Sequence, residues 1–297
     1  MKGRKWPWVL LGIMSTTCWG ISGIFAKMLF AISPRVSPMI VTQVRMIIGG
    51  IAILLVGWLA GRHPLRIWRR WHDAGTIISY GILGLIPVQL FYFMAVKAGN
   101  ASIATILQFI GPFFIMLYMA VRHHEIPSRL EVISAVAAFI GVVVVATNGR
   151  FTQLAITPLV LIYGLISAVG VATNTLIPRS LLKNFSSMEI TGWGLVIAGI
   201  GLEVVSPTRI TFTLIPRVLV MFLMIIIIGT VIPFITFTTV LKYISPTVAS
   251  MLDAFEPLTA TVGSVLVLGL HLSLATIIGS LVIIIAVIGL NYQPNEE

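Results

Sequence analysis

Long apolar stretches recur along the whole chain, and they limit its possible folds more than any other feature. A window of about 20 mostly apolar residues is long enough to cross a hydrocarbon core about 30 Å thick. The connectors are short, so no separate soluble domain fits between the windows. The sequence therefore predicts an all-α integral membrane protein with ten transmembrane helices, over Trp8–Phe30, Pro38–Leu59, Ala74–Val96, Ser102–Val121, Leu130–Thr147, Pro158–Ile177, Met188–Ser206, Val218–Leu241, Val248–Leu270 and Leu272–Tyr292.

The composition supports this class and excludes others. Hydrophobic residues make up 58% of the chain and charged residues only 9%, and the mean hydropathy is +1.06, which is unlike a soluble domain. The net charge is +10, but the basic residues lie in short loops and form no face for a phosphate backbone, so nucleic acid is not expected as a partner. The single cysteine, Cys18, leaves no intramolecular disulfide and no zinc site.

The distribution of lysine and arginine predicts the orientation. With a cytoplasmic N-terminus, twelve of these residues lie in inner loops and five in outer loops, and the first half of the chain carries most of the bias. We therefore expect a multi-pass protein of the cytoplasmic membrane with both termini inside. The inner loop Gly61–Asp73 holds Trp68 and Trp71 among four arginines, so we expect it to contact anionic lipid headgroups.

The two halves of the chain are related. The stretch Asn100–Pro112 recurs as Ser245–Pro257, and Pro87 recurs as Pro233. Each half holds five predicted helices, and an odd number means that the second half enters the membrane upside down. The sequence therefore predicts two inverted five-helix repeats, residues 1–149 and 150–297, a construction common in secondary transporters. The alternative is a duplicated membrane scaffold without a transport role.

Cys18-Trp19-Gly20-Ile21-Ser22 in the first predicted helix, and the pattern from Ala95 through Ala104 and Pro112 to Glu125, are motifs that resemble the EamA family of the drug/metabolite transporter superfamily, and the resemblance covers nearly all of the chain. One departure is that Leu270-His271 stands where the second copy usually ends with a glutamate. The resemblance implies two inverted five-helix repeats, a cavity lined mainly by helices 1, 3, 4, 6, 8 and 9, and movement of small metabolites, often amino acids and often outward. The residues that carry it are Cys18–Ser22, Arg45, Ala95, Ala104, Pro112, Glu125 and Gly141, then Leu241, Ala249, Pro257 and Gly279.

Two acidic residues, Asp253 and Glu256, stand within the ninth predicted span. Glu256 is about 12 Å of helical rise into the span, near the middle of a core about 30 Å thick. Asp253 is three residues earlier, on the same helical face. Charges at this depth are costly and usually functional, so the pair is a candidate site for a substrate ammonium or a proton. Alternatively, one or both pair with Arg45 or Lys27 only to stabilise the fold.

Other polar or helix-breaking residues within the spans are further candidates. Arg45 could bind a substrate carboxylate through its fork of donors, but a packing or ion-pair role is favoured, because the family resemblance does not place helix 2 at the cavity. The remaining polar residues could orient a zwitterion or only join helices, and the prolines could be hinges or fixed kinks. The polar candidates are Trp19, Ser22, Gln89, Tyr92, Gln108 and Asn174, and the hinge candidates are Pro87, Pro112, Pro233 and Pro257.

These features together predict a secondary transporter for small organic metabolites, amino acids or related zwitterions above all, that works by alternating access. No cofactor and no catalysis are expected, because no P-loop, GxSxG or Walker-type lysine is present, and His123-His124-Glu125 lacks further ligands for a metal. The alternatives are an ion-conducting pore, a scaffold protein or an intramembrane enzyme. Membrane lipid and a small-molecule substrate are the expected partners, and protons are a candidate coupling ion.

Overall fold

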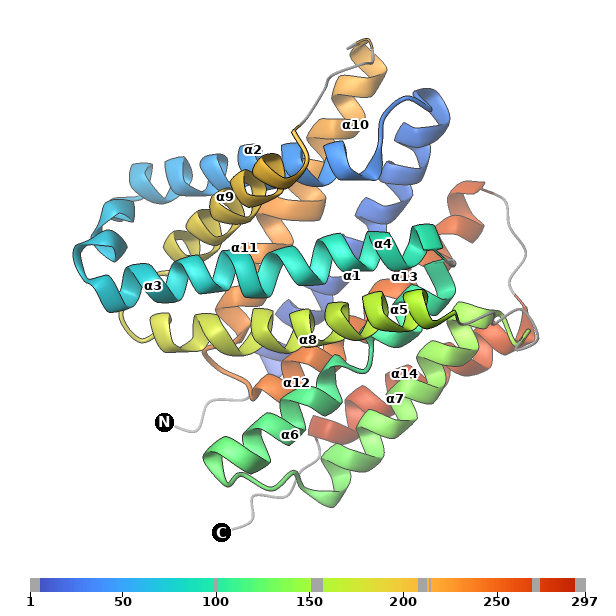
Figure 1. Cartoon of the computed structure of the whole chain (residues 1–297). Helices are drawn as coiled ribbons and strands as arrows, with labels where there is room; N and C mark the ends of the chain where they lie inside the picture. Colours follow the sequence, from blue (N-terminus) through green and yellow to red (C-terminus); the bar gives the residue numbers. More distant parts are fainter. Residues whose placement is uncertain are drawn as a thin grey trace.

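The computed structural model describes residues 6–98, 101–150, 157–207, 213, 215–268 and 273–291, and regular structure within these residues is helical throughout (Figure 1). Segments η2, η3 and η5 are π-helical, and η1 and η6 are 3-10 helices. In chain order the elements are α1 Trp6–Ile32, α2 Pro38–Leu59, η1 Pro64–Arg69, α3 Trp71–Ser79, η2 Tyr80–Leu85, η3 Pro87–Phe91, α4 Tyr92–Ala98, α5 Ala101–Gln108, α6 Gly111–His123, α7 Arg129–Thr147, α8 Pro158–Leu181, α9 Ser187–Val205, α10 Pro216–Ile226, η5 Ile227–Val231, α11 Ile232–Val240, α12 Pro246–Met251, η6 Leu252–Ala254, α13 Phe255–Leu268 and α14 Leu274–Asn291.

The all-helical membrane class is confirmed. Eight helical stretches of the described residues are long and apolar enough to cross a membrane, and the remaining two predicted spans fall on residues 246–268 and on α14. Helix α2 begins and ends at the predicted residues. The third, fourth, eighth and ninth predicted spans are each built from shorter helical pieces, and these are the spans whose prolines were predicted to be hinges or fixed kinks. The number of membrane crossings stays a prediction.

Side chains cap the helices at several loop ends. Ser128 accepts a hydrogen bond from the backbone of Glu131, whose carboxylate accepts from the backbone of Ser128. Ser186 and Glu189 form the same reciprocal box at the start of α9. Capping satisfies backbone donors that the first helical turn leaves free. The carboxylates of Glu131 and Glu189 therefore have a structural role, as caps at the starts of α7 and α9.

Two helix pairs flank the bundle, and glycines set their close approach. Helix α2 packs on α9, and α7 packs on α14 (Figure 1). A Cβ on Gly50 would lie 2.8 Å from the carbonyl oxygen of Gly192, and one on Gly192 would lie 3.2 Å from that of Gly50. Gly141 and Gly279 show the same reciprocal relationship, at 2.8 and 2.9 Å. Small residues at such crossings allow membrane helices to pack backbone against backbone.

The two long helices α1 and α8 occupy equivalent positions in the centre of the bundle. Helix α1 packs on α13 and α11, and α8 packs on η2, η3 and α5. Gly12 of α1 receives the side chain of Leu252, while Gly164 of α8 receives that of Leu107. In each case, therefore, the first helix of one half packs on the fourth helix of the other.

The loops predicted to face the cytoplasm meet at one end of the bundle. Trp8 at the start of α1 stacks on Tyr243, with ring centroids 3.5 Å apart. The indole of Trp193, in the second turn of α9, donates to the carbonyl of Pro64, at 2.8 Å. At the other end, Asn148 accepts from Thr276 at 2.8 Å. This grouping agrees with the predicted loop assignment, while the orientation of the protein in a membrane stays a prediction.

Candidate functional site

The two acidic residues lie where the ninth predicted span is broken. Asp253 is in the 3-10 turn η6, and Glu256 is in the first turn of α13 with Pro257 directly after it. Proline is tolerated in a first turn, because its missing N–H would have no partner there. Both acidic side chains are half-buried. The Asp253 Oδ1 atom is buried and has no hydrogen-bond partner among the described residues, so it is free to accept from a ligand.

Arg45 of α2 lies in the interior of the protein, in the same region as Glu256. Its Nη2 donates a hydrogen bond to the Oε1 atom of Gln89 in η3. Its charge also interacts with that of Glu256, although the two form no direct ion pair. A guanidinium at membrane depth is costly unless it has partners inside the bundle. Opposite charges therefore face one region of the interior and remain separated.

Tyr92 extends this group of polar residues. Its hydroxyl lies 3.3 Å from Thr105 Oγ1 of α5, and it is close enough to Glu256 to interact with its charge. Gln89 and Tyr92 therefore both belong to the environment of the Arg45–Glu256 pair. Sequence reasoning missed Thr105, although it precedes Gln108 by three residues and so shares its helical face.

Trp19 and its neighbour Gly20 bring α1 against the acidic segment. The indole of Trp19 packs on Phe234 and Phe237, with ring centroids 5.2 Å away in each case. Its Nε1 atom is buried and without a hydrogen-bond partner among the described residues. A Cβ on Gly20 would lie 2.6 Å from the carbonyl oxygen of Glu256. Helix α1 thus crosses α13 at the level of Glu256.

Ser22 and Asn174 lie at two equivalent helix crossings. Ser22 contacts Gly229 in the π-helical segment η5, and Asn174 contacts Gly84 in the π-helical segment η2. The Oδ1 atom of Asn174 is buried without a partner in the described part of the chain, as at Asp253. Ser22 therefore packs at the contact between α1 and η5. Asn174 packs at the contact between α8 and η2, and its Oδ1 atom can still accept a hydrogen bond.

The side-chain amide nitrogen of Gln108 donates hydrogen bonds to two neighbouring helices. It donates to the carbonyl of Val88 at 3.0 Å and to Ser167 Oγ at 2.8 Å. These bonds join α5, η3 and α8. Its counterpart in the second half, Asp253, has an unused oxygen instead. Gln108 and Asp253, which the predicted repeat aligns, thus differ in their hydrogen bonding.

The four prolines all follow irregular backbone. Pro87 comes after η2, and Pro233 comes after η5, both π-helical. Pro112 is the second residue of α6, after a break at residues 109–110, and Pro257 is the third residue of α13, which follows η6. A proline lacks the N–H that would bond four residues back. For Pro87 that carbonyl belongs to Leu83, and it accepts from Thr173 Oγ1 at 2.6 Å instead.

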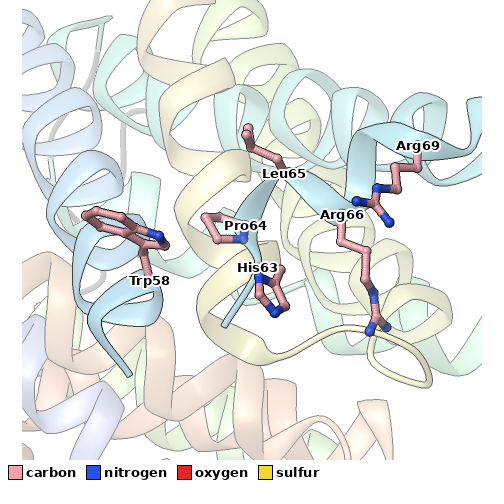
Figure 2. A pocket seen from close by; sticks show the side chains of 6 residues that line it. All are labelled: Trp58, His63, Pro64, Leu65, Arg66 and Arg69. Atoms are coloured by element: carbon pink, nitrogen blue, oxygen red, sulfur yellow. The ribbon is translucent and has the colours of Figure 1, made fainter. Parts of the chain in front are cut away.

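Two hollows lie away from this interior group, at the end of the bundle that holds the basic loops. Figure 2 shows one of them, between Trp58 and the segment His63–Arg69. Neither hollow is lined by Arg45, Asp253 or Glu256. The interior polar residues are thus packed among helices rather than along these two hollows. Leu270-His271, where the family resemblance departs, lies outside the described residues.

The fold and site define a polytopic helical membrane protein that holds separated opposite charges inside its bundle. The model of the EamA-like transporter family matches residues 6–147 and again residues 158–292. The chain belongs to this family. It is thus a multi-pass membrane protein of a transporter family.

Comparison with individual proteins agrees with this assignment. An uncharacterized inner membrane transporter, YicL, of Salmonella typhimurium is 27% identical over 277 residues, which cover 93% of this chain and 92% of that protein. An uncharacterized transporter of Archaeoglobus fulgidus is 22% identical over 207 residues, 68% of each chain. A solved crystal structure shares the fold with a TM-score of 0.79 at 19% identity, over 96% of both chains.

Proposed function

We propose that this protein is a secondary transporter that moves small zwitterionic metabolites, such as amino acids, outward across the cytoplasmic membrane. The observation that carries the proposal is the position of Arg45 relative to Glu256. Both lie inside the helix bundle, their charges interact, and they form no direct ion pair. A buried pair of opposite charges that do not touch leaves both with unfilled hydrogen-bonding capacity.

A zwitterion carries the two groups that these residues lack. A guanidinium binds both oxygens of a carboxylate through its fork of donors. The Gln89 bond holds Arg45 in place from one side, and a substrate carboxylate would bind its remaining donors. The substrate ammonium would lie at Glu256, with the free Oδ1 of Asp253 as a second acceptor. Trp19 Nε1 is an additional unused donor at the same level of α1.

Inverted repeats of residues 1–149 and 150–297 would let this site open to each side in turn. Reciprocal contacts support the repeats. Gly50 packs against Gly192, and Gly141 packs against Gly279, and in each pair the carbonyl oxygen of one glycine lies next to the Cα atom of the other. In a two-fold arrangement, a contact of one residue with its counterpart is returned by that counterpart. The paired π-helical segments before Pro87 and Pro233 are further support. Their irregular backbones, with those at Pro112 and Pro257, are the proposed hinges.

A thermal-shift screen of the purified protein tests the substrate class, because a ligand stabilises the state that it binds. Each amino acid would be compared with its methyl ester, which lacks the carboxylate, and with its deaminated acid, which lacks the ammonium. We expect the melting temperature to rise with a zwitterion and much less with either analogue. Arg45→Gln should remove the preference for the carboxylate, and Glu256→Gln the preference for the ammonium.

A matched control is Arg35→Gln, which removes an exposed loop arginine and should leave the ligand response unchanged. Equal shifts with the zwitterion, the ester and the acid would overturn the proposed recognition. Ligand responses that persist unchanged in both interior variants would place the substrate site elsewhere.

A further inference from the structure

Two adjoining hollows at the loop end of the bundle form a composite cavity. The first has a volume of about 400 Å³, lies between Trp58 and the loop His63–Arg69, and has Pro64 and Leu65 in its wall (Figure 2). The second has a volume of about 350 Å³ and lies between Gly61–Arg66, the turn that joins α8 to α9, and Lys242. His63 and Arg66 line both hollows. Apolar surface predominates in the first hollow, although His63, Arg66 and Arg69 also line it, and polar surface predominates in the second.

The second hollow, which is the polar part of the cavity, carries an excess of positive charge. Arg62, Arg66, Lys183 and Lys242 line it, and its one acidic lining residue is Glu189. The Glu189 Oε2 atom accepts 2.8 Å bonds from both the backbone and the hydroxyl of Ser186, so the helix cap uses this carboxylate. Among the described residues, the Nδ1 atom of His72 lies 3.6 Å from the Oδ1 atom of Asp73, outside this hollow. The four cations thus face the hollow without an anionic partner.

Hydrogen bonds and aromatic contacts hold the walls in place. Trp193 donates to the carbonyl of Pro64 at 2.8 Å, and its ring packs edge-on against Trp68, with centroids 5.0 Å apart. The guanidinium of Arg66 donates to the carbonyl of Asn184 at 2.5 Å and lies 5.3 Å from the ring centre of Phe185. The loop after α2 is therefore docked on the α8–α9 turn, and the cavity is formed before any ligand binds.

The aromatic side chains around the cavity are typical of the level where a membrane meets water. Trp58 stands one residue before the end of α2, and Trp71 begins α3 with 94% of its surface exposed. Tryptophan is enriched at the headgroup level of bilayers. Leu65, which is exposed, lines the first hollow together with Trp58. A ligand here would reach both the headgroup region and the acyl region.

We propose that this cavity is a specific site for one anionic phospholipid of the membrane. The lipid phosphate would bind Arg62, Lys183 and Lys242 in the polar hollow, and its acyl chains would lie along Trp58 and Leu65. Basic pockets between transmembrane helices on the cytoplasmic side bind such headgroups by charge. An amphipathic anion matches both parts of the cavity.

The bound lipid would join the two halves of the chain. Arg62 belongs to the first matched segment, residues 6–147, and Lys183 and Lys242 belong to the second, residues 158–292. A phosphate between them would neutralise cations from both segments at once. The lipid would thus stabilise the arrangement in which these two loops are docked.

The test uses the purified full-length protein in detergent, with phosphatidylglycerol as the anionic lipid. Native mass spectrometry counts retained lipids, and a melting curve measures stabilisation. We expect one retained phosphatidylglycerol and a raised melting temperature. Phosphatidylcholine, inorganic phosphate and glycerophosphoglycerol, which has the headgroup without acyl chains, should each give at least tenfold weaker binding.

The variant Arg62→Gln/Lys183→Gln/Lys242→Gln should bind phosphatidylglycerol at least tenfold more weakly than wild type. Its control is Arg35→Gln/Arg122→Gln/Arg129→Gln, which removes the same charge from exposed residues outside both hollows and outside the loop Gly61–Asp73, and it should bind as wild type does. If the first variant melts early without lipid, Arg62→Gln and Lys183→Gln singly should each show a partial loss. Equal weakening in the control, equal binding of phosphatidylcholine, or full binding of free phosphate would overturn the proposal.

Discussion

Gly141 of α7 and Gly279 of α14 approach so closely that each backbone carbonyl occupies the space a side chain on the other would need. A Cβ on Gly141 would lie 2.8 Å from the Gly279 oxygen, and one on Gly279 would lie 2.9 Å from the Gly141 oxygen. Both neighbours are backbone atoms of helices, so neither can move without shifting its whole helix. This contact joins the fifth predicted helix to the tenth.

Gly141→Ala should therefore destabilise the protein although alanine favours helix. Overpacking of this kind costs about 1–3 kcal/mol, more than the roughly 1 kcal/mol that alanine contributes over glycine in a helix. The measurement is the melting temperature in detergent. Gly23→Ala is the control, because nothing lies within 4 Å of a Cβ there. A Gly141→Ala protein as stable as Gly23→Ala would contradict the close packing of α7 on α14.

In the sequence, Gly141 and Gly279 stood out only as residues that carry the family resemblance, and their contact came from the structure, where small residues allow membrane helices to cross closely. The apolar window also predicted both ends of α2, Pro38 and Leu59, and the structure shows that Ser37 caps its start. The sequence did not predict the π-helical segments η2 and η5 or the 3-10 turn η6. A uniformly apolar window has no polar face, so its hydrophobic pattern contains no signal for a local change of helical pitch.

The candidate site was partly predictable for a related reason. The depth of Arg45 in its span follows from counting residues, but its direction does not, because α2 is apolar on all sides and has no face marked as interior. The packing of α2 against neighbouring helices turns Arg45 toward Gln89 and Glu256. Likewise, Gln108 and Asp253 align in sequence, yet their surroundings decide which is bonded and which retains a free oxygen.

The different surroundings of Gln108 and Asp253 lead to opposite expected effects of substitution. Gln108→Ala removes the donor to Val88 and Ser167, so it should lower stability by about 1 kcal/mol, as for hydrogen bonds between membrane helices. Asp253→Asn keeps the shape and should leave stability unchanged or raised, because a neutral amide is cheaper to bury than a carboxylate.

The measurement combines the melting temperature of each variant with its ligand-induced shift. We expect Gln108→Ala to lose stability and keep its ligand response, and Asp253→Asn to do the reverse. The opposite assignment, with Asp253→Asn unstable and Gln108→Ala unresponsive, would mean that the repeat-related roles are exchanged.

The orientation can be checked with single cysteines, because Cys18 is the only cysteine in the chain. In a Cys18→Ala background, we expect His72→Cys to be protected from a membrane-impermeant maleimide added outside intact cells. Arg150→Cys should react. His72 is 87% exposed in its side chain and Arg150 is exposed, so both should be accessible on their own side. Three predicted spans separate His72 from Arg150, so the two positions should lie on opposite sides of the membrane. Labelling of both from the same side would contradict this topology.

Pro257 should matter for turnover more than for binding. Pro257→Ala restores a backbone donor after η6 and favours a continuous helix through Asp253 and Glu256. We expect transport several-fold slower with ligand affinity largely kept. Pro216→Ala, at the start of α10 and far along the chain from the acids, is the control and should transport normally. Unchanged turnover in Pro257→Ala would make the break at η6 a fixed kink.

The stability of Glu256→Gln separates a ligand role from a structural one. If Glu256 serves mainly to balance Arg45, removing its charge leaves a buried cation unbalanced, and the melting temperature should fall by several degrees. The double variant Arg45→Gln/Glu256→Gln would then recover it. Our account predicts instead that Glu256→Gln folds and melts as wild type does, because the Arg45 guanidinium keeps its bond to Gln89.

Counterflow in proteoliposomes is the most direct test of the central claim. Liposomes loaded with the unlabelled zwitterion that gives the largest thermal shift would take up the same compound in labelled form, at several pH values. Our account predicts saturable, transient accumulation for wild type and its loss in both Glu256→Gln and Arg45→Gln, with the proteins still folded. Wild-type counterflow and an unchanged pH profile in Glu256→Gln would contradict the assignment of this residue to the transport site.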